Sequence, residues 1–154
     1  MNSAELRQLI ETGVGMVMST RNADMWPDLC EVVGLHLRED SKMMSVFVSQ
    51  AHADHSLQNI KSNGAIAVSL SRPCTFEAAQ IKGKVVGVRP MTTEEHNQSQ
   101  AWAERFRKEI QLIGVTNEAA MGLKLQADTT LEVEVENIYL QTPGPRAGTK
   151  LELA

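Results

Sequence analysis

The pattern of apolar and polar positions along the chain predicts six segments of strand length. These are residues 14–20, 29–37, 42–50, 65–71, 75–89 and 130–140. The last segment alternates apolar with acidic residues, which is typical of a half-exposed strand, and Asn137 breaks its phase as a bulge would. Gly83 and Gly87 interrupt the long fifth segment and indicate bulges or sharp bends.

Helical spacing separates these segments in two longer stretches. Residues 1–13 form the first, with Ser3 as the expected N-cap. The second runs from Thr92 to Gly114 and opens with a capping box between Thr92 and Glu95. Its apolar stripe is expected to face the sheet and consists of Trp102, Phe106, Ile110 and Ile113.

Two shorter helices and an irregular tail complete the pattern. One helix follows the third strand and stops at Asn63 and Gly64, and another is expected within residues 116–126. Residues 141–154 are too rich in Pro and Gly to be regular. Since few strands are followed by helices, this order favours a closed antiparallel barrel over a doubly wound sheet. We expect a mainly β fold with α excursions, in a single domain of residues 1–154.

Composition narrows the class of protein further. The net charge of -4 argues against a nucleic-acid surface or an anionic-membrane surface, because both need a basic face. No apolar run approaches the roughly 20 residues that span a bilayer, and the first residues lack a signal-peptide core. A cytoplasmic protein is therefore expected. Cys30 and Cys74 are expected to be reduced thiols, with one disulfide between them as the alternative.

Candidate chemistry concentrates in residues 48–64, VSQAHADHSLQNIKSNG. His52, Asp54 and His55 are spaced too closely for metal ligands on one helix face, so we predict no metal site. The alternative to a metal site is that Asp54 or Ser56 caps the helix and the histidines are solvated. A helix start offers unpaired N–H groups and partial positive charge, so an anion cradle is better founded, with Ser49, Gln50 and Ser56 as further donors. We find no nucleophile or phosphate-loop motif and leave the catalytic residues unassigned.

Four stretches together resemble the pyridoxamine 5'-phosphate oxidase-like family of FMN-binding split barrels. They are NADMWP, HSLQNIKSNGAIAVSL, TFEAAQIKGKVVGV and IYLQTPGPRAG, and the resemblance extends from about Gly13 onward. It implies a six-stranded antiparallel split β-barrel with flanking helices. It also implies a homodimer with flavin mononucleotide (FMN) between the subunits and the phosphate near the helix after the third strand.

The resemblance also implies which residues bind the cofactor. Val48, Ser49, Gln50 and Ser56 match the phosphate and ribityl side. Thr75, Gln80 and Lys82 match positions that face the cofactor or the partner subunit, although an outward barrel face is an equal interpretation.

Ser56 stands where many relatives have a basic residue. The phosphate-binding charge would then come from Arg72, Lys82 or Arg146. Trp26 is the aromatic residue nearest the first turn, where it either stacks on the flavin or is simply exposed.

The function implied is that of a flavin-dependent oxidoreductase acting on an unidentified small molecule, with electrons from a reduced nicotinamide. Two alternatives stay open. One is a split barrel that binds haem or another tetrapyrrole, with His36, His52, His55 or His96 as iron ligand. The other is a cofactor-free dimeric binding protein.

Overall fold

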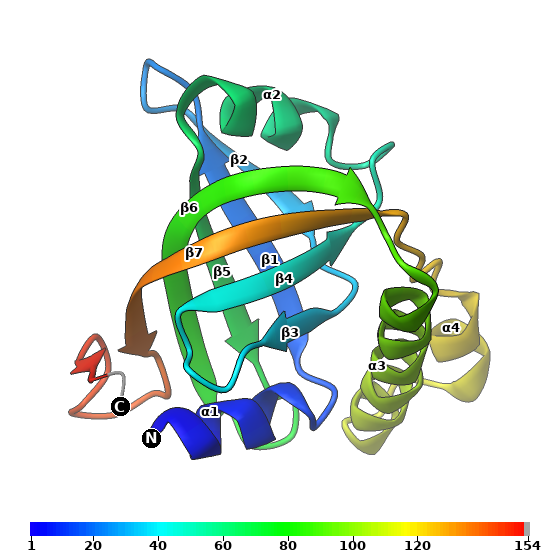
Figure 1. Cartoon of the computed structure of the whole chain (residues 1–154). Helices are drawn as coiled ribbons and strands as arrows, with labels where there is room; N and C mark the ends of the chain where they lie inside the picture. The colour runs from blue at the N-terminus through cyan, green and yellow to red at the C-terminus, as the bar shows by residue number, and fades with distance from the viewer. Residues whose placement is uncertain (153–154) are drawn as a thin grey trace.

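The computed structural model describes residues 1–152, which form one curled sheet and four helices (Figure 1). The strands in chain order are β1 (Gly15–Arg21), β2 (Pro27–Glu31), β3 (Leu35–Leu37), β4 (Met43–Val48), β5 (Ala65–Ser71), β6 (Ala78–Pro90), β7 (Thr129–Leu140) and β8 (Lys150–Leu151). The helices are α1 (Ser3–Ile10), α2 (Asp54–Asn63), α3 (Thr93–Leu112) and α4 (Asn117–Gly122).

All strand pairs are antiparallel, in the order β2-β1-β5-β6-β7-β4-β3, with β8 added to β7. The long strands β6 and β7 curve across the molecule, with β5, β1 and β2 on one side and β4 and β3 on the other (Figure 1). Helix α1 lies at one end of the barrel and α2 at the opposite end, while α3 and α4 lie beside it (Figure 1). The interior is apolar, and its largest fully buried side chains include Phe47, Leu6, Met18 and Met44.

This architecture confirms the mainly β, antiparallel split-barrel prediction but not the count of six strands. The expected strand 29–37 is two strands, β2 and β3, which turn at residues 32–34. Gly34 has φ +132°, and a Cβ there would lie 2.8 Å from the Phe47 ring, so the chain bends closely around that side chain. The additional short strand β8 lies inside the expected irregular tail, whose last residues, 153–154, fall outside the described part of the chain.

The long strand β6 bends where its glycines were predicted to interrupt it. Its register against β7 shifts between Lys82 and Gly83 and again between Val85 and Gly87. A Cβ on Gly83 would lie 2.1 Å from the Glu134 carbonyl oxygen, so only glycine fits this bulge. The extra residue opposite the first shift is Glu136, one position before the Asn137 that the sequence pattern indicated.

The helix ends follow local capping chemistry. The predicted box on α3 is present, with the Thr92 side chain accepting from the Glu95 amide. For α1 the N-cap is Asn2 rather than Ser3, because Asn2 forms a capping box with Glu5.

The α3 stripe packs as predicted over most of its length. Trp102 donates its Nε1–H to the Val14 carbonyl at 2.9 Å and stacks on Phe106. Ile113 does not belong to this stripe, because it lies past the last helical turn and is 56% exposed. No helix within residues 1–152 combines the length and apolarity needed to cross a membrane.

Candidate functional site

Helix α2 begins where β4 ends, and its first turn is open. Ala53 is its N-cap, and no side chain caps it. The turn before it closes on itself, because His52 and Ala53 donate their amides to the Ser49 carbonyl. The Leu57 amide then donates to the Ala53 carbonyl at 2.7 Å. Within the described chain the amides of residues 54–56 have no acceptor, so they carry the partial positive charge of the helix start.

Neither Asp54 nor Ser56 occupies the N-cap position, so the interpretation of either residue as the helix cap was wrong. Asp54 is exposed in the first turn, where its carboxylate accepts from the Gln58 side chain at 3.1 Å. Ser56 is the third residue of the helix and is fully buried. The reason is helical phase, since Ser56 and Ile60 lie on the face of α2 that packs against the barrel.

The Ser56 hydroxyl belongs to a polar cluster that joins α2 to strands β1 and β2. It donates to Asp28 Oδ2 and accepts from Thr20 Oγ1 at 3.3 Å. Asn59, one turn further along α2, donates its Nδ2–H to Thr20 Oγ1 at 3.1 Å. The hydroxyl that was expected to bind phosphate is therefore used inside the protein, and Ser56 fixes the helix instead.

The end of β4 contributes three of the expected residues to the α2 start. Val48 is fully buried, Ser49 is half-buried and Gln50 is exposed. The Gln50 amide donates to Asp128 Oδ1 at 2.9 Å, which fixes the turn from outside. The Ser49 hydroxyl and the Gln50 carboxamide have no hydrogen-bond partner within residues 1–152. Both side chains are therefore available beside the open amides.

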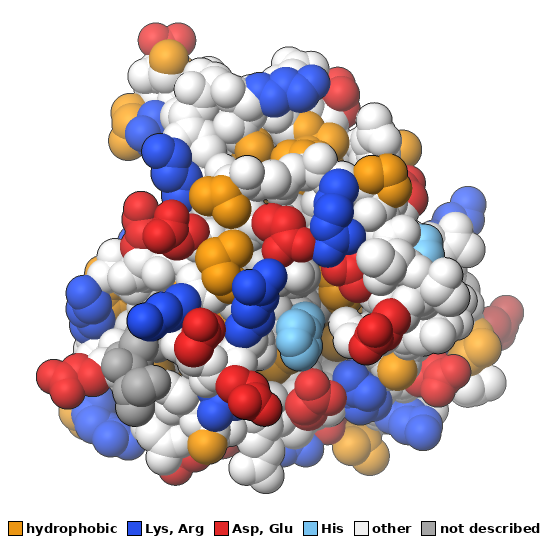
Figure 2. Space-filling view, in the orientation of Figure 1, with side chains coloured by type: hydrophobic (Ala, Val, Ile, Leu, Met, Phe, Trp, Pro, Cys, Tyr) orange, Lys and Arg blue, Asp and Glu red, His pale blue; other side chains and the backbone are white. Residues whose placement is uncertain are grey.

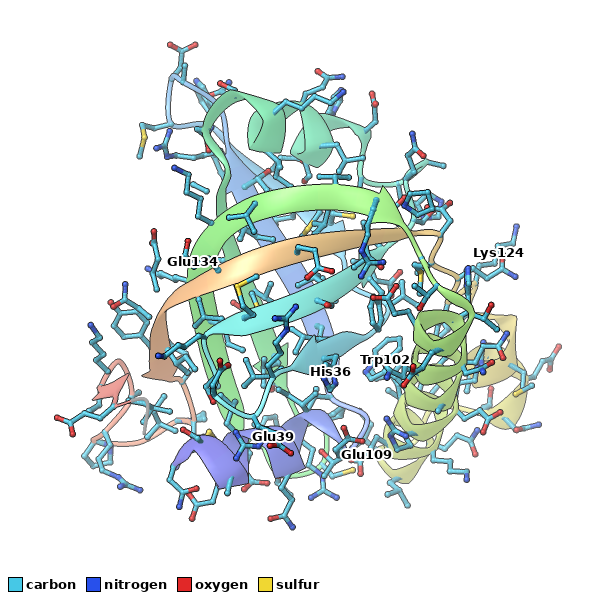
Figure 3. All side chains as sticks on the ribbon, viewed as in Figure 1. His36, Glu39, Trp102, Glu109, Lys124 and Glu134 are labelled. Atoms are coloured by element: carbon cyan, nitrogen blue, oxygen red, sulfur yellow. The ribbon has the colours of Figure 1, made fainter. Side chains whose placement is uncertain are left out.

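Arg72 and Thr75 lie elsewhere, in the hairpin between β5 and β6. Arg72 forms a two-pronged ion pair with Glu109 of α3, with its Nη2 2.9 Å from Oε1 (Glu109 is labelled in Figure 3). Hydrogen bonding to Glu109 raises the pKa of Arg72, and the same bonds lower the pKa of Glu109. The Thr75 hydroxyl donates to Glu77 at 2.9 Å. This hairpin is thus at the α1 end of the barrel, away from α2.

Gln80 and Lys82 lie in the first half of β6, on the outer face of the sheet. Gln80 donates its Nε2–H to the Ser69 hydroxyl at 3.1 Å, and the Lys82 Nζ lies 5.3 Å from the centre of the Tyr139 ring. Arg146 lines a pocket together with Arg72. The chain therefore does not gather the eight expected residues into a single group, and none of the three expected replacement cations is hydrogen-bonded or ion-paired to α2.

The first hairpin exposes its aromatic side chain. Trp26 is 73% exposed at the tip between β1 and β2, next to Met25 and Leu29, which are each 68% exposed. Met25 has φ +66°, and the Asn22 carboxamide accepts from the Trp26 amide at 2.9 Å, so the turn holds these side chains outward. Of the two interpretations of Trp26, surface exposure describes this structure.

A charge cluster on the outer face was missed at the sequence level. Arg89 of β6 donates to both oxygens of Glu95, at 2.8 and 2.6 Å, and also pairs with Glu132 of β7. Bonds from Arg89 bring the pKa of Glu95 down to about 2. Figure 2 shows basic and acidic side chains side by side on this face, with apolar side chains between them. The only sequence signals were the capping box and the strand alternation, which located Glu95 and Glu132 but not their shared partner.

The remaining candidate groups do not form a metal or thiol site. His36, His52, His55 and His96 are all exposed, and residues 1–152 contain no group of three or more His, Cys, Asp or Glu side chains placed to hold a metal ion. His36 lies on β3, on the face shown in Figure 3, whereas His52 precedes α2 and His55 lies on it. Cys30 and Cys74 are free thiols, and burial raises the pKa of Cys30 to about 11.

Comparison with known proteins finds the fold but no sequence relative. No protein-family profile and no curated protein sequence matches this chain. HupZ of Group A Streptococcus is similar in structure, with a TM-score of 0.58 and 17% identity over 96% of this chain and 100% of that one. An F420 reductase aligns with a TM-score of 0.54 and 15% identity, covering 86% of this chain and 94% of that one.

A third solved structure carries the family name. A putative pyridoxamine 5'-phosphate oxidase from Lactobacillus delbrueckii aligns with a TM-score of 0.54 and 9% identity, over 89% of this chain and 92% of that one. At such identities the likeness concerns the fold, and it extends over nearly the full length of both chains. The chain therefore shares the split-barrel fold of these solved structures.

Proposed function

We propose that this chain is an FMN-binding split-barrel protein that works as a homodimer, with the flavin phosphate at the start of α2. The observation that carries the proposal is the open first turn, where the amides of residues 54–56 have no acceptor within the described chain. A phosphate at a helix start needs no other motif, because the amides and the helix dipole both favour an anion. Structural likeness to an F420 reductase and to a putative pyridoxamine 5'-phosphate oxidase supports a cofactor of this class.

The donors present fit a phosphate without a lysine. Ser49 and Gln50 add uncharged side-chain donors at the end of β4, and His52 and His55 are exposed at the same turn. An imidazole supplies a charged donor when protonated, which makes these histidines the nearest substitutes in sequence for the missing basic residue. Because most donors are neutral, we expect weaker phosphate binding than a lysine would give.

Asp54 opposes the phosphate from within the first turn. Its carboxylate is exposed and its only side-chain bond among residues 1–152 is the one that it accepts from Gln58. A negative charge there stabilises the helix start but repels a bound anion. The residue that limits FMN affinity in this proposal is therefore Asp54, while the buried Ser56 plays a positioning role.

The flavin ring would lie on the outer face of the sheet, where small side chains leave the backbone accessible. Ser19, Ala67 and Lys82 are register neighbours on β1, β5 and β6, and Ser69 is paired with Gln80. Lys82 and Gln80 would orient the ring or contact the partner subunit. When bound, FMN would supply the electron transfer from a reduced nicotinamide to a small acceptor. The chain's own part is to bind and orient it, and no described side chain is assigned as an acid or base.

Paired titrations with FMN and riboflavin test the proposal, because riboflavin lacks the phosphate. We expect the fluorescence of FMN to be quenched when it binds at micromolar protein concentration. FMN should bind about tenfold more tightly than riboflavin, a difference in binding free energy of about 1.4 kcal/mol. Asp54→Asn should strengthen FMN binding about three- to fivefold and leave riboflavin unchanged. Glu118→Gln, which removes an acid from the first turn of α4, is the matched control.

Each other result has a definite meaning. Equal affinity for FMN and riboflavin would show that the start of α2 does not bind the phosphate. Binding of neither flavin at micromolar concentration would refute the function and favour the cofactor-free dimer. A Soret band that forms with added haem, and disappears on replacing one of the four exposed histidines, would favour the tetrapyrrole alternative instead.

A further inference from the structure

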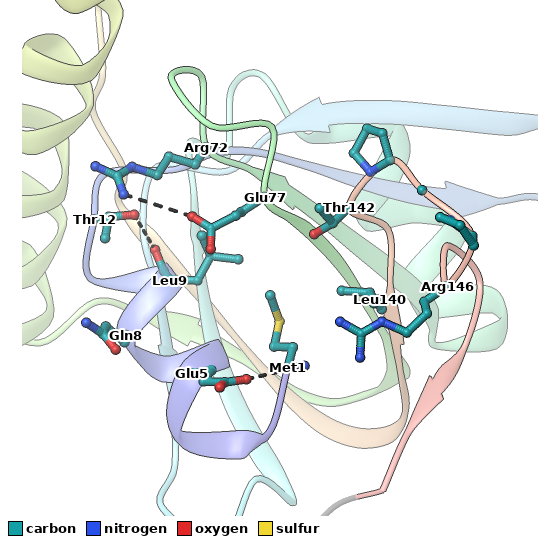
Figure 4. A pocket seen from close by; sticks show the side chains of 13 residues that line it. Met1, Glu5, Gln8, Leu9, Thr12, Arg72, Glu77, Leu140, Thr142 and Arg146 are labelled. Carbon is teal, nitrogen blue, oxygen red and sulfur yellow. Dashed lines mark hydrogen bonds and ion pairs between the residues drawn. The ribbon is translucent and has the colours of Figure 1, made fainter.

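A pocket is lined in part by residues of α1. Helix α1 lies at the end of the barrel opposite α2 (Figure 1). Helix α1, the hairpin between β5 and β6, and the tail after β7 enclose about 630 Å³. Figure 4 shows α1 on one side of this space and the tail residues on the other. The volume is within the range of about 300–1,000 Å³ typical of small-molecule sites, so the pocket is large enough to act as one.

The pocket has an apolar floor and structural polar walls. Leu9 and Leu140 are almost fully buried and form the floor. Two threonine hydroxyls line the wall but are already used, since Thr12 donates to the Leu9 carbonyl at 2.7 Å and Thr142 bonds to the backbone of Ala78. A ligand would therefore gain apolar contact from the floor and little from these hydroxyls.

Three of the charged groups are also already engaged. Arg72 directs its Nε and Nη2 to Glu109, outside the pocket. Glu5 accepts from the Asn2 amide at 2.8 Å in the capping box of α1, and it pairs with the α-ammonium group of Met1 at 3.2 Å. None of these groups is free to pair with a ligand without breaking a structural contact.

Arg146 and Glu77 are the charges that remain available. Arg146 reaches from the tail into the pocket, and among residues 1–152 it has no hydrogen bond or ion pair (Figure 4). Glu77 uses its Oε2 for Thr75 and, at 4.0 Å, for Arg72, which leaves Oε1 without a partner in the described chain. In Figure 4 the two side chains lie on different sides of the apolar floor.

We propose that this pocket binds a small zwitterion of the amino-acid class. Its carboxylate pairs with Arg146, its ammonium group pairs with Glu77, and its side chain lies on Leu9 and Leu140. A guanidinium is the donor best matched to a carboxylate, because it offers two parallel N–H groups. Opposite charges on two walls select a ligand with both charges, whereas a simple anion would meet the Glu77 carboxylate and a simple cation would meet Arg146.

Isothermal titration of the full chain with three matched probes tests this site. L-Leucine carries both charges, isocaproate lacks the ammonium group and isoamylamine lacks the carboxylate. We expect L-leucine to bind and each single-charge analogue to bind at least about tenfold more weakly, since each loses one charge-assisted contact. Failure of L-leucine to bind at millimolar concentration, or equal binding of all three probes, would overturn the proposal.

Variants of the two charged residues assign the contacts. Arg146→Gln should weaken L-leucine about tenfold and leave isoamylamine unchanged or tighter. Glu77→Gln should remove the preference for L-leucine over isocaproate. Lys61→Gln and Glu118→Gln, at exposed positions on α2 and α4, are the controls and should leave all three affinities unchanged. L-Leucine binding that is the same in Arg146→Gln as in the parent chain would refute the assignment.

Discussion

Replacing Ser56 by alanine tests whether its hydroxyl holds the helix or a ligand. The change removes a donor to the Asp28 carboxylate and an acceptor for Thr20, at a position with no solvent exposure. Water cannot easily replace these bonds, and a hydrogen bond to a charged group contributes about 1.5–3 kcal/mol. We therefore expect Ser56→Ala to lower the free energy of unfolding by about 2 kcal/mol.

Urea denaturation followed by tryptophan fluorescence measures this loss directly. In a chain of this size 1 kcal/mol corresponds to about 2–4 °C, so the midpoint of thermal unfolding should fall by about 4–8 °C. FMN affinity should stay within about twofold of the parent value, because the amides of residues 54–56 remain in place. Ser62→Ala is the matched control, since Ser62 is on the same helix and exposed.

Two results would refute this reasoning. A loss below about 0.5 kcal/mol, or one equal to that of Ser62→Ala, would mean that the hydroxyl does not anchor α2. A clear loss of FMN affinity with an unchanged free energy of unfolding would show that the Ser56 hydroxyl binds the ligand. The double change Ser56→Ala with Asp28→Asn should cost less than the sum of the two single changes, because the contacting groups share one interaction.

Three further predictions concern stability and reactivity. Bonds from Arg89 lower the pKa of Glu95 from 4.5 to about 2, so its ionised carboxylate stabilises the fold above about pH 4.5. This contribution is about 1–2 kcal/mol after solvent screening, and it is lost as the pH falls towards 2. Glu95→Gln should abolish this pH dependence of stability in urea titrations between pH 7 and 2.5. Gly83→Ala should cost about 3 kcal/mol of unfolding free energy, because its Cβ would overlap the Glu134 carbonyl. Cys30, with its pKa near 11, should resist iodoacetamide at neutral pH until the protein is unfolded, as mass spectrometry would show.

Matched changes control two of these predictions. Glu94→Gln removes an exposed acid from the same turn as Glu95 and should leave the acid dependence intact. Gly87→Ala places its Cβ 3.6 Å from the nearest atom, an ordinary contact, and should cost less than about 1 kcal/mol. Equal losses in the two glycine variants would show that the bulge at Gly83 tolerates a side chain.

Local chemistry explains which parts of the fold were predictable. The capping box between Thr92 and Glu95 needs only residues three positions apart, so it fixes the start of α3 wherever the helix packs. The bulge at Gly83 was predictable because no other residue fits such a close backbone approach. The break between β2 and β3 was missed, because Gly34 bends around Phe47, a partner that adjacent sequence does not reveal.

The candidate site depended more on contacts between distant residues. Ser56 was assigned to phosphate because it sits near a helix start, but its direction depends on Asp28, 28 positions away. Arg72 was a candidate for the phosphate-binding charge. Its guanidinium is instead hydrogen-bonded to Glu109, 37 positions away in the sequence. Helical phase and ion-pair choice are set by tertiary packing, so residue type and spacing alone could locate the start of α2 but not the hydrogen-bond partners of the side chains around it.

The open first turn of α2 has a consequence for how relatives of this chain would vary. Main-chain amides are the same in every residue except proline, so an anion site built from them imposes almost no requirement on side chains. Selection would then act on what holds the turn in place, such as the hydroxyl at 56, the carboxylate at 28 and the absence of proline at 54–56. Homologues would be recognised by this scaffold rather than by a charged residue.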